Sequence, residues 1–180
     1  MSRPRIYEEI PDFYRIIPLA PLRRTPGVLF DNVPMEMLPQ IGAIDRVIHH
    51  SGAISPGPVG EIARPWYMHL HQDDNLIVLY GRREVDIYHP EHGLQSFVVT
   101  PELITRPDGT PVYDGPAMLV WPRYVFHRIV SGPEGSASLN FAVHYPGLDP
   151  HTNFNIYSLN QQDGERQMIR EGFRDQGFSA

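Results

Sequence analysis

The segment Trp66–Gly81, WYMHLHQDDNLIVLYG, contains two histidines one residue apart, then an acidic pair and a run of apolar residues. Side chains of a β-strand alternate between its two faces, so His69 and His71 are expected on one face, about 6.6 Å apart at the backbone. Two imidazoles at that spacing can hold one metal ion at about 2.0–2.2 Å, and Asp74 can add a carboxylate from the next strand. The segment therefore predicts a strand with a metal site.

A third histidine occurs in the segment GPAMLVWPRYVFHRIV, residues 115–130. Here a strand is expected to end at Pro122, turn, and begin again with His127 on the same face as Val125 and Ile129. A His-x-His pair on a strand often has no function, and it needs a further ligand from elsewhere to form a site. His127 is the residue that we expect to supply it.

The first segment resembles the first motif of the cupin superfamily, in which a His-x-His pair is followed by a glutamate and, after six further residues, a glycine. Six residues separate Asp74 from Gly81, so Asp74 stands in the position of the glutamate. The gap between His71 and this carboxylate is one residue shorter than in the motif. Counting forward from His71 instead selects Asn75, and Asp73 is a further alternative.

The second segment resembles the second cupin motif, Pro-x-Gly-x-x-His, in Pro122 and His127, with Tyr124 in place of the glycine. The resemblance spans residues 41–145 and implies an all-β, cupin-like jelly-roll barrel with one divalent metal ion. Fe(II) is favoured, and Mn(II), Ni(II), Zn(II) or Cu(II) also suit imidazole-rich sites. The implied ligands are His69, His71, His127 and Asp74, the last either as a direct ligand or as a group that orients a metal-bound water.

The remaining sequence suggests one domain with two tails. The 19 prolines and 15 glycines are dispersed between short apolar segments, which is typical of many short strands joined by turns. We expect the barrel at residues 41–148. The proline-rich residues 1–40 predict an extended N-terminal arm that lies over the domain or over a partner subunit. Residues 149–180 predict a tail with a short C-terminal helix that includes Asp163, Met168, Ile169 and Phe173.

Composition excludes several classes of partner. The net charge of −6 and the absence of a long Lys/Arg cluster argue against nucleic acids and anionic lipids. No apolar run is long enough for a membrane span or a signal peptide, so a cytoplasmic protein is expected. The absence of cysteine excludes disulfides and thiolate ligands. Leu76–Tyr80 is apolar on both faces, which predicts a strand covered by the arm or by a second subunit, and a homodimer is expected.

Further candidate catalytic residues surround the two motifs. His144, on the strand after His127, and Asp73 are possible bases. Tyr67 and Tyr80 share strand parity with His69 and Asp74 and are expected to line the cavity. Arg123 is a possible charge partner for an anionic substrate, whereas Arg128 is weaker because alternation places it opposite His127.

Three functions fit such a site, each with a small-molecule substrate. The favoured one is an oxygenase, in which a redox-active ion binds both O₂ and an organic substrate at its open positions. The second is a metal-dependent isomerase or lyase, in which the ion acts on a carbonyl and a nearby base moves a proton. The third is a noncatalytic ligand-binding module.

Overall fold

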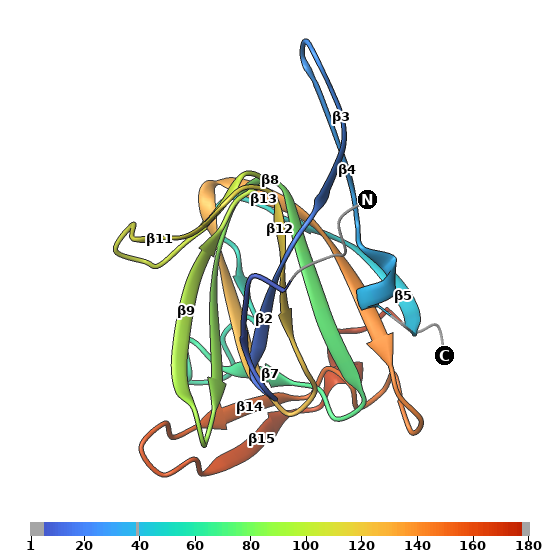
Figure 1. Ribbon diagram of the computed structural model, residues 1–180. Helices are drawn as coiled ribbons and strands as arrows, with labels where there is room; N and C mark the ends of the chain where they lie inside the picture. The colour runs from blue at the N-terminus through green and yellow to red at the C-terminus, as the bar shows by residue number, and fades with distance from the viewer. Residues whose placement is uncertain (1–5, 39, 178–180) are drawn as a thin grey trace.

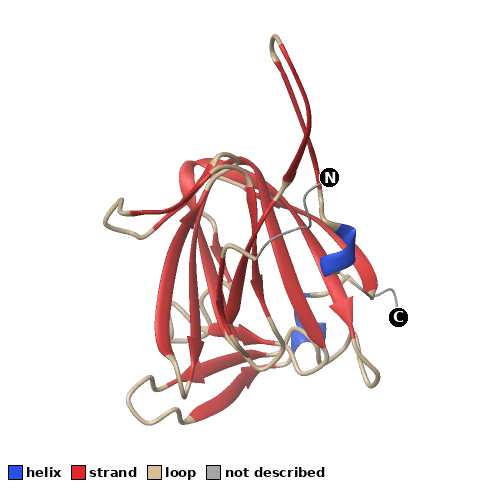
Figure 2. Cartoon of the chain, viewed as in Figure 1, coloured by secondary structure: helices blue, strands red, loops and turns tan. Residues whose placement is uncertain are grey.

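The computed structural model describes residues 6–38 and 40–177, and they form a barrel built almost entirely of strands (Figures 1 and 2). Within these residues, no helix has the length and apolar character needed to span a membrane. The elements in chain order are β1 (Glu8–Ile10), β2 (Tyr14–Pro18), β3 (Ala20–Thr25), β4 (Val28–Asn32), the 3-10 helix η1 (Met35–Met37), β5 (Ile41–His49), β6 (Ile54–Ser55), β7 (Trp66–Met68), β8 (Gln72–His89), β9 (Gly93–Val99), β10 (Leu103–Thr105), β11 (Pro111–Asp114), β12 (Ala117–Trp121), β13 (Phe126–His144), β14 (Ile156–Leu159), β15 (Arg166–Arg170) and the 3-10 helix η2 (Gly172–Asp175).

Two long antiparallel strands, β8 and β13, organise the barrel. Their pairing runs from Gln72 opposite His144 to Tyr88 opposite Phe126, and it shifts register beside Gly81. Before Gly81, β8 pairs with β12 on its other edge, and after Gly81 it pairs with β9. The same two strands therefore contribute to both walls of the barrel, and Figure 1 shows them reaching its upper end together.

Gly81 occupies the corner of β8, and only glycine fits there. Its φ is +68°, and a Cβ atom would lie 2.1 Å from the carbonyl oxygen of Gly135.

We predict that Gly81→Ala lowers the free energy of unfolding by about 3 kcal/mol or more, because the backbone strain and the steric clash add to each other. Gly93→Ala is the matched control, since Gly93 has φ +72° and a Cβ atom there would lie more than 4 Å from every described atom outside its chain neighbours. It should cost only about 1–2 kcal/mol. Equal losses for both variants in urea denaturation would contradict the clash.

The strands bury apolar side chains on both faces of the wall that contains the first half of β8. Leu76 and Val78 belong to the cluster inside the barrel. Ile77 points the other way and packs with Leu38, close to Val33 of the N-terminal segment. The sequence predicts that Leu76–Tyr80 is covered by the N-terminal arm or by a second subunit, and at Ile77 residues of the N-terminal segment provide this cover.

The N-terminal segment differs in part from the predicted arm. β2 lies between β1 and β12 in the main sheet, so it is a strand of the barrel, and its Phe13–Ile17 neighbourhood is buried. Proline did not prevent this because Pro11 precedes the strand and Pro18 ends it. The β3–β4 hairpin does extend away from the barrel (Figure 1).

The C-terminal segment is a hairpin and not the predicted helix. Met168 and Ile169 lie in β15, which pairs with β14, and β14 pairs in turn with β7. Among the described residues of this segment, only the single turn η2, which includes Phe173, is helical. The loop Asn160–Glu165 explains the difference, because Asp163 caps the turn of a β-hairpin by accepting from the Asn160 side chain and the Glu165 backbone.

Candidate metal centre

His69, Asp74 and His127 converge inside the barrel from three different elements. His69 follows β7, Asp74 lies near the start of β8, and His127 lies near the start of β13. All three are buried, and their potential ligand atoms lie within 4.8 Å of one another. Asp74 Oδ2 is 3.2 Å from His69 Nε2 and 3.6 Å from His127 Nε2. The structure thus brings together three of the four predicted ligands.

These separations suit a divalent ion. Ligand bonds of about 2.0–2.2 Å at tetrahedral or octahedral angles place neighbouring ligand atoms about 2.8–3.6 Å apart. The distances from Asp74 Oδ2 to His69 Nε2, 3.2 Å, and to His127 Nε2, 3.6 Å, lie in this range. Both distances from the carboxylate to the imidazoles therefore suit a metal ion bound by the three side chains.

Each imidazole is oriented through its other nitrogen. His69 Nδ1 donates to the backbone carbonyl of Asn153, and His127 Nδ1 lies 3.3 Å from the carbonyl oxygen of Val125. A carbonyl can only accept, so Nδ1 is the protonated nitrogen and Nε2 is directed to Asp74. Metal-binding histidines in proteins are usually fixed in this way.

Amide and indole groups hold the carboxylate of Asp74. Its Oδ1 accepts from Gln72 Nε2 and Asn140 Nδ2, both at 2.7 Å, and its Oδ2 accepts from Trp121 Nε1 at 3.0 Å. Asn153 donates to Gln72 Oε1 at 2.9 Å and so extends this network to the loop that orients His69. Three hydrogen bonds to its two oxygens therefore hold the carboxylate in place.

Burial and charge act against each other on the three groups. Burial opposes ionisation of Asp74, but the neighbouring histidines outweigh it and hold the pKa of Asp74 below its usual range. Burial alone would lower the pKa of His69, but the negative charge of Asp74 outweighs burial, so the pKa of His69 is raised. Burial and the charge of His69 lower the pKa of His127 to about 4. The site therefore favours an anionic carboxylate beside at least one neutral imidazole, the protonation states that bind metals.

His71, the fourth predicted ligand, lies outside this group. The chain bends between β7 and β8, where the carbonyl of His69 accepts from the Tyr124 backbone and that of His71 from the Tyr145 backbone. The bend interrupts strand alternation, so Leu70 and His71 both leave the inner face. The ring of His71 instead lies beside Gly147.

Three other predicted residues lie away from the cavity. Asp73 accepts from the Arg123 backbone at 2.8 Å and from the Tyr145 hydroxyl at 2.8 Å. The Arg123 guanidinium stacks on Tyr145, 4.4 Å from its ring centroid. His144 packs beside Gly42 of β5. Neither of the two predicted bases, Asp73 and His144, is among the residues that line the cavity.

The two predicted tyrosines separate. Tyr67 lines the cavity, with its ring centroid 5.9 Å from that of His127. Tyr80 is 59% exposed, because the β8–β13 pairing shifts register between Val78 and Tyr80 and so interrupts strand alternation. Tyr124, at the glycine position of the second motif, has φ +71°, a left-handed conformation that suits glycine best. The turn of the motif is therefore present without its glycine.

The three converging residues line a cavity of about 270 Å³ inside the barrel. Its wall also includes residues that the two motifs did not select. These are Asp45, Val47, His49, Ser55, Gln72, Leu76, Arg83, Trp121, Ile129, Ser138, Asn140 and Phe154. Alternation along the predicted strand 41–50 could have identified Asp45, Val47 and His49 as one face, but not which face is inside.

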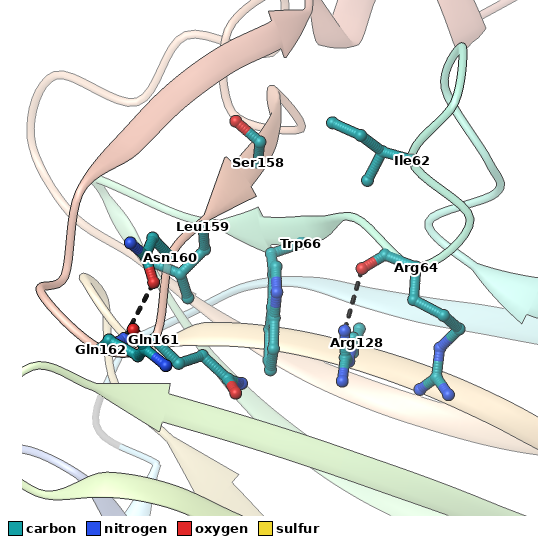
Figure 3. Close-up of a pocket in the computed structure, with 9 residues that line it drawn as sticks. All are labelled: Ile62, Arg64, Trp66, Arg128, Ser158, Leu159, Asn160, Gln161 and Gln162. Carbon is teal, nitrogen blue, oxygen red and sulfur yellow. Dashed lines mark hydrogen bonds between the residues drawn. The ribbon is translucent and has the colours of Figure 1, made fainter.

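A second pocket of about 460 Å³ lies outside the barrel between β13, β14 and the loop before β7 (Figure 3). Arg128 lines it, stacked 4.0 Å from the ring centroid of Trp66. Arg128 donates to Asp86 and to the carbonyl of Arg64. Strand alternation correctly predicted that Arg128 faces away from His127.

No protein-family model matches the sequence, and no curated protein matches it. Among solved structures, the sugar epimerase NovW from Streptomyces spheroides matches with a TM-score of 0.56 at 9% identity, over 83% of this chain and 71% of its own. A dTDP sugar isomerase from Desulfovibrio desulfuricans has a TM-score of 0.53 at 14% identity, over 74% and 80%. The sugar 3,4-ketoisomerase QdtA from Thermoanaerobacterium thermosaccharolyticum, solved with TDP, has 0.52 at 12%, over 76% and 84%. The chain therefore shares the all-β barrel fold of these proteins, the kind of fold that the resemblance to the cupin motifs implied.

Proposed function

We propose that this protein is an isomerase that moves a proton next to a carbonyl group of a small hydroxyketone, with a divalent ion held by His69, Asp74 and His127. The observation that supports it most is the convergence of two imidazole nitrogens and one carboxylate oxygen on the wall of a cavity. A bound ion would polarise the carbonyl oxygen of the substrate. The remaining chemistry is a proton transfer, which side chains of the cavity can perform.

Asp45 is the best placed proton acceptor. It lines the cavity, and its Oδ2 accepts from Asn140 Nδ2 at 3.1 Å. The same amide nitrogen donates to Asp74 Oδ1 at 2.7 Å, so one side chain positions both carboxylates. We assign to Asp45 the removal of a proton from the substrate carbon with the hydroxyl group. The proton returns to the former carbonyl carbon, which leaves an isomeric hydroxyketone.

Tyr67 is suited to the second proton movement, which takes place between the two substrate oxygens. Burial raises its pKa, so its hydroxyl group remains protonated at neutral pH. Its ring lies beside both imidazoles and Phe154, with centroid distances of 6.4 Å to His69, 5.9 Å to His127 and 6.2 Å to Phe154. Its hydroxyl group can therefore donate to an oxygen of a molecule in the cavity. Phe154 covers the same region with an apolar ring.

Solved structures of the same fold support this class over the oxygenase that the sequence favours, because those compared above are described as sugar isomerases or epimerases. One observation keeps the oxygenase as a second candidate. Two histidines and one carboxylate with open positions is also the ligand set of non-haem Fe(II) oxygenases. Because His71 lies outside the converging group, the candidate ligands are two histidines and one carboxylate, as in those oxygenases.

The two candidates differ in their need for oxygen. We predict that the protein loaded with Zn(II) or Mn(II) catalyses deuterium incorporation from D₂O at the carbon next to the carbonyl of its substrate, under strict anaerobiosis. NMR against a panel of hydroxyketones and keto-sugars, free and nucleotide-linked, measures it. Turnover only with Fe(II) and with consumption of O₂ would replace the isomerase by the oxygenase.

A further inference from the structure

A second polar feature of the cavity is the buried guanidinium group of Arg83. Arg83 follows the Gly81 corner on β8, on the inward face with Val85, and is 1% exposed. It also lines the cavity that contains the candidate metal ligands. Its neighbour Arg82 is exposed and pairs with Glu84. Two adjacent residues of the same type thus have opposite environments.

Arg83 has no counter-charge in the described part of the chain. Its Nε donates to Ser136 Oγ at 2.9 Å and its Nη2 to the carbonyl of Val47 at 3.1 Å. Among residues 6–38 and 40–177, no carboxylate oxygen lies within 4.0 Å of the Arg83 guanidinium nitrogens, so no ion pair forms. Its Nη1 has no hydrogen-bond partner among these residues. Burial lowers the pKa of Arg83 to about 10, which leaves it charged at neutral pH. A buried charge without a partner is unfavourable, and arginine is rarely retained in such a place without a reason.

Ser138 is an independent sign of a ligand at the same place. It is 1% exposed and lines the cavity, yet its Oγ has no hydrogen-bond partner among the described residues. It lies two residues beyond Ser136, the residue that accepts from Arg83. Buried hydroxyl groups are nearly always paired, so this one needs an explanation.

His49 lies near Arg83 but adds no second positive charge to this part of the cavity. Its Nδ1 is 2.9 Å from Ser131 Oγ, which lies 2.7 Å from Ser136 Oγ. Burial and the charge of Arg83 lower the pKa of His49 to about 4, so it is neutral at pH 7. One fixed cation and one hydroxyl donor match one singly charged anion.

We propose that Arg83 and Ser138 bind a carboxylate group of the substrate. The planar guanidinium fork suits the two oxygens of a carboxylate, and a phosphate would bring a second negative charge with no cation to meet it. This inference deepens the proposed function, on which it rests for the reacting end of the substrate. Together they describe a small hydroxyketone acid, with its carbonyl at the candidate metal ligands and its carboxylate at Arg83.

The test uses propionate and its neutral, equally sized analogue propionamide, titrated into the full chain and followed by NMR of the arginine Nε–H groups. We expect propionate to perturb the Arg83 signal and to bind at least about 10-fold more tightly than propionamide. Arg83→Gln should weaken propionate binding by about 10-fold to 100-fold, whereas Arg82→Gln, the matched control, should not change it. Tighter binding of inorganic phosphate than of propionate would overturn the assignment to a carboxylate.

Ser138→Ala is a second variant that tests the site if Arg83→Gln does not fold. It removes a hydroxyl group that forms no hydrogen bond with any described residue, so the melting temperature should not fall while propionate affinity decreases several-fold. Unchanged propionate binding in this variant and in folded Arg83→Gln refutes the site. The same titration of His127→Ala separates the two proposals. If this variant still binds propionate, and the unmodified protein binds no metal and isomerises no substrate, the proposed function alone is contradicted.

Discussion

Replacement of Asp45 by asparagine should slow deuterium incorporation into the substrate by about 10²-fold to 10⁴-fold, the usual contribution of a positioned general base. The variant removes the proton acceptor but keeps a side-chain oxygen that can still accept from Asn140 Nδ2. Metal binding and the melting temperature are therefore expected to remain close to those of the unmodified protein. The rate is measured by NMR in D₂O with saturating substrate.

Asp73→Asn is the control for this result, because Asp73 is a buried carboxylate of the same region that accepts from Arg123 and Tyr145 outside the cavity. It should leave the rate of exchange nearly unchanged. If Asp45→Asn keeps the full rate and Tyr67→Phe loses it, Tyr67 is the proton acceptor and the role of Asp45 is wrong.

Metal affinity should decrease more than about 100-fold in His127→Ala and in Asp74→Asn. Groups that only support a ligand typically contribute 10-fold to 100-fold, and the loss of a ligand should exceed that. In Asp74→Asn, the new amide group also faces the donors Gln72, Asn140 and Trp121, which prefer an acceptor. Isothermal titration of the metal-free protein with Zn(II), supported by elemental analysis, measures both affinities.

Neighbouring residues provide the controls for the metal prediction. His71→Ala and Asp73→Asn should bind Zn(II) as the unmodified protein does, because both side chains lie outside the group of converging ligands. A large loss in His71→Ala with little change in His127→Ala would contradict the arrangement described here. It would restore the adjacent histidine pair that the sequence alone predicts.

The sequence identifies the three residues that converge in the candidate site because they follow the spacing of the cupin motifs. Asp74 was found by its distance from Gly81, and the glycine is required there by its left-handed φ and by contact with Gly135. His127 was found by its distance from Pro122. These positions are fixed by backbone geometry, which a spacing pattern records directly.

The sequence could not locate features that depend on interrupted alternation or on distant contacts. His71 was expected inside because the bend after His69 has no proline or glycine to mark it. Arg83 was overlooked because it follows an identical residue with an exposed side chain. Asn140 interacts with Asp45 and Asp74, which are far from it in sequence, and only the fold brings them together.

The course of β8 through both walls has a consequence for substrate length. Asp74 and Arg83 belong to the same strand, on either side of the Gly81 corner, and pairing with β13 holds both halves in register. The spacing between the two ends of the substrate site is therefore set by one covalently continuous, hydrogen-bonded strand and not by mobile loops. Such a strand fixes the distance between the candidate metal ligands and Arg83. Acids of one chain length should therefore reach both, and acids with one carbon more or fewer should contact only one of them.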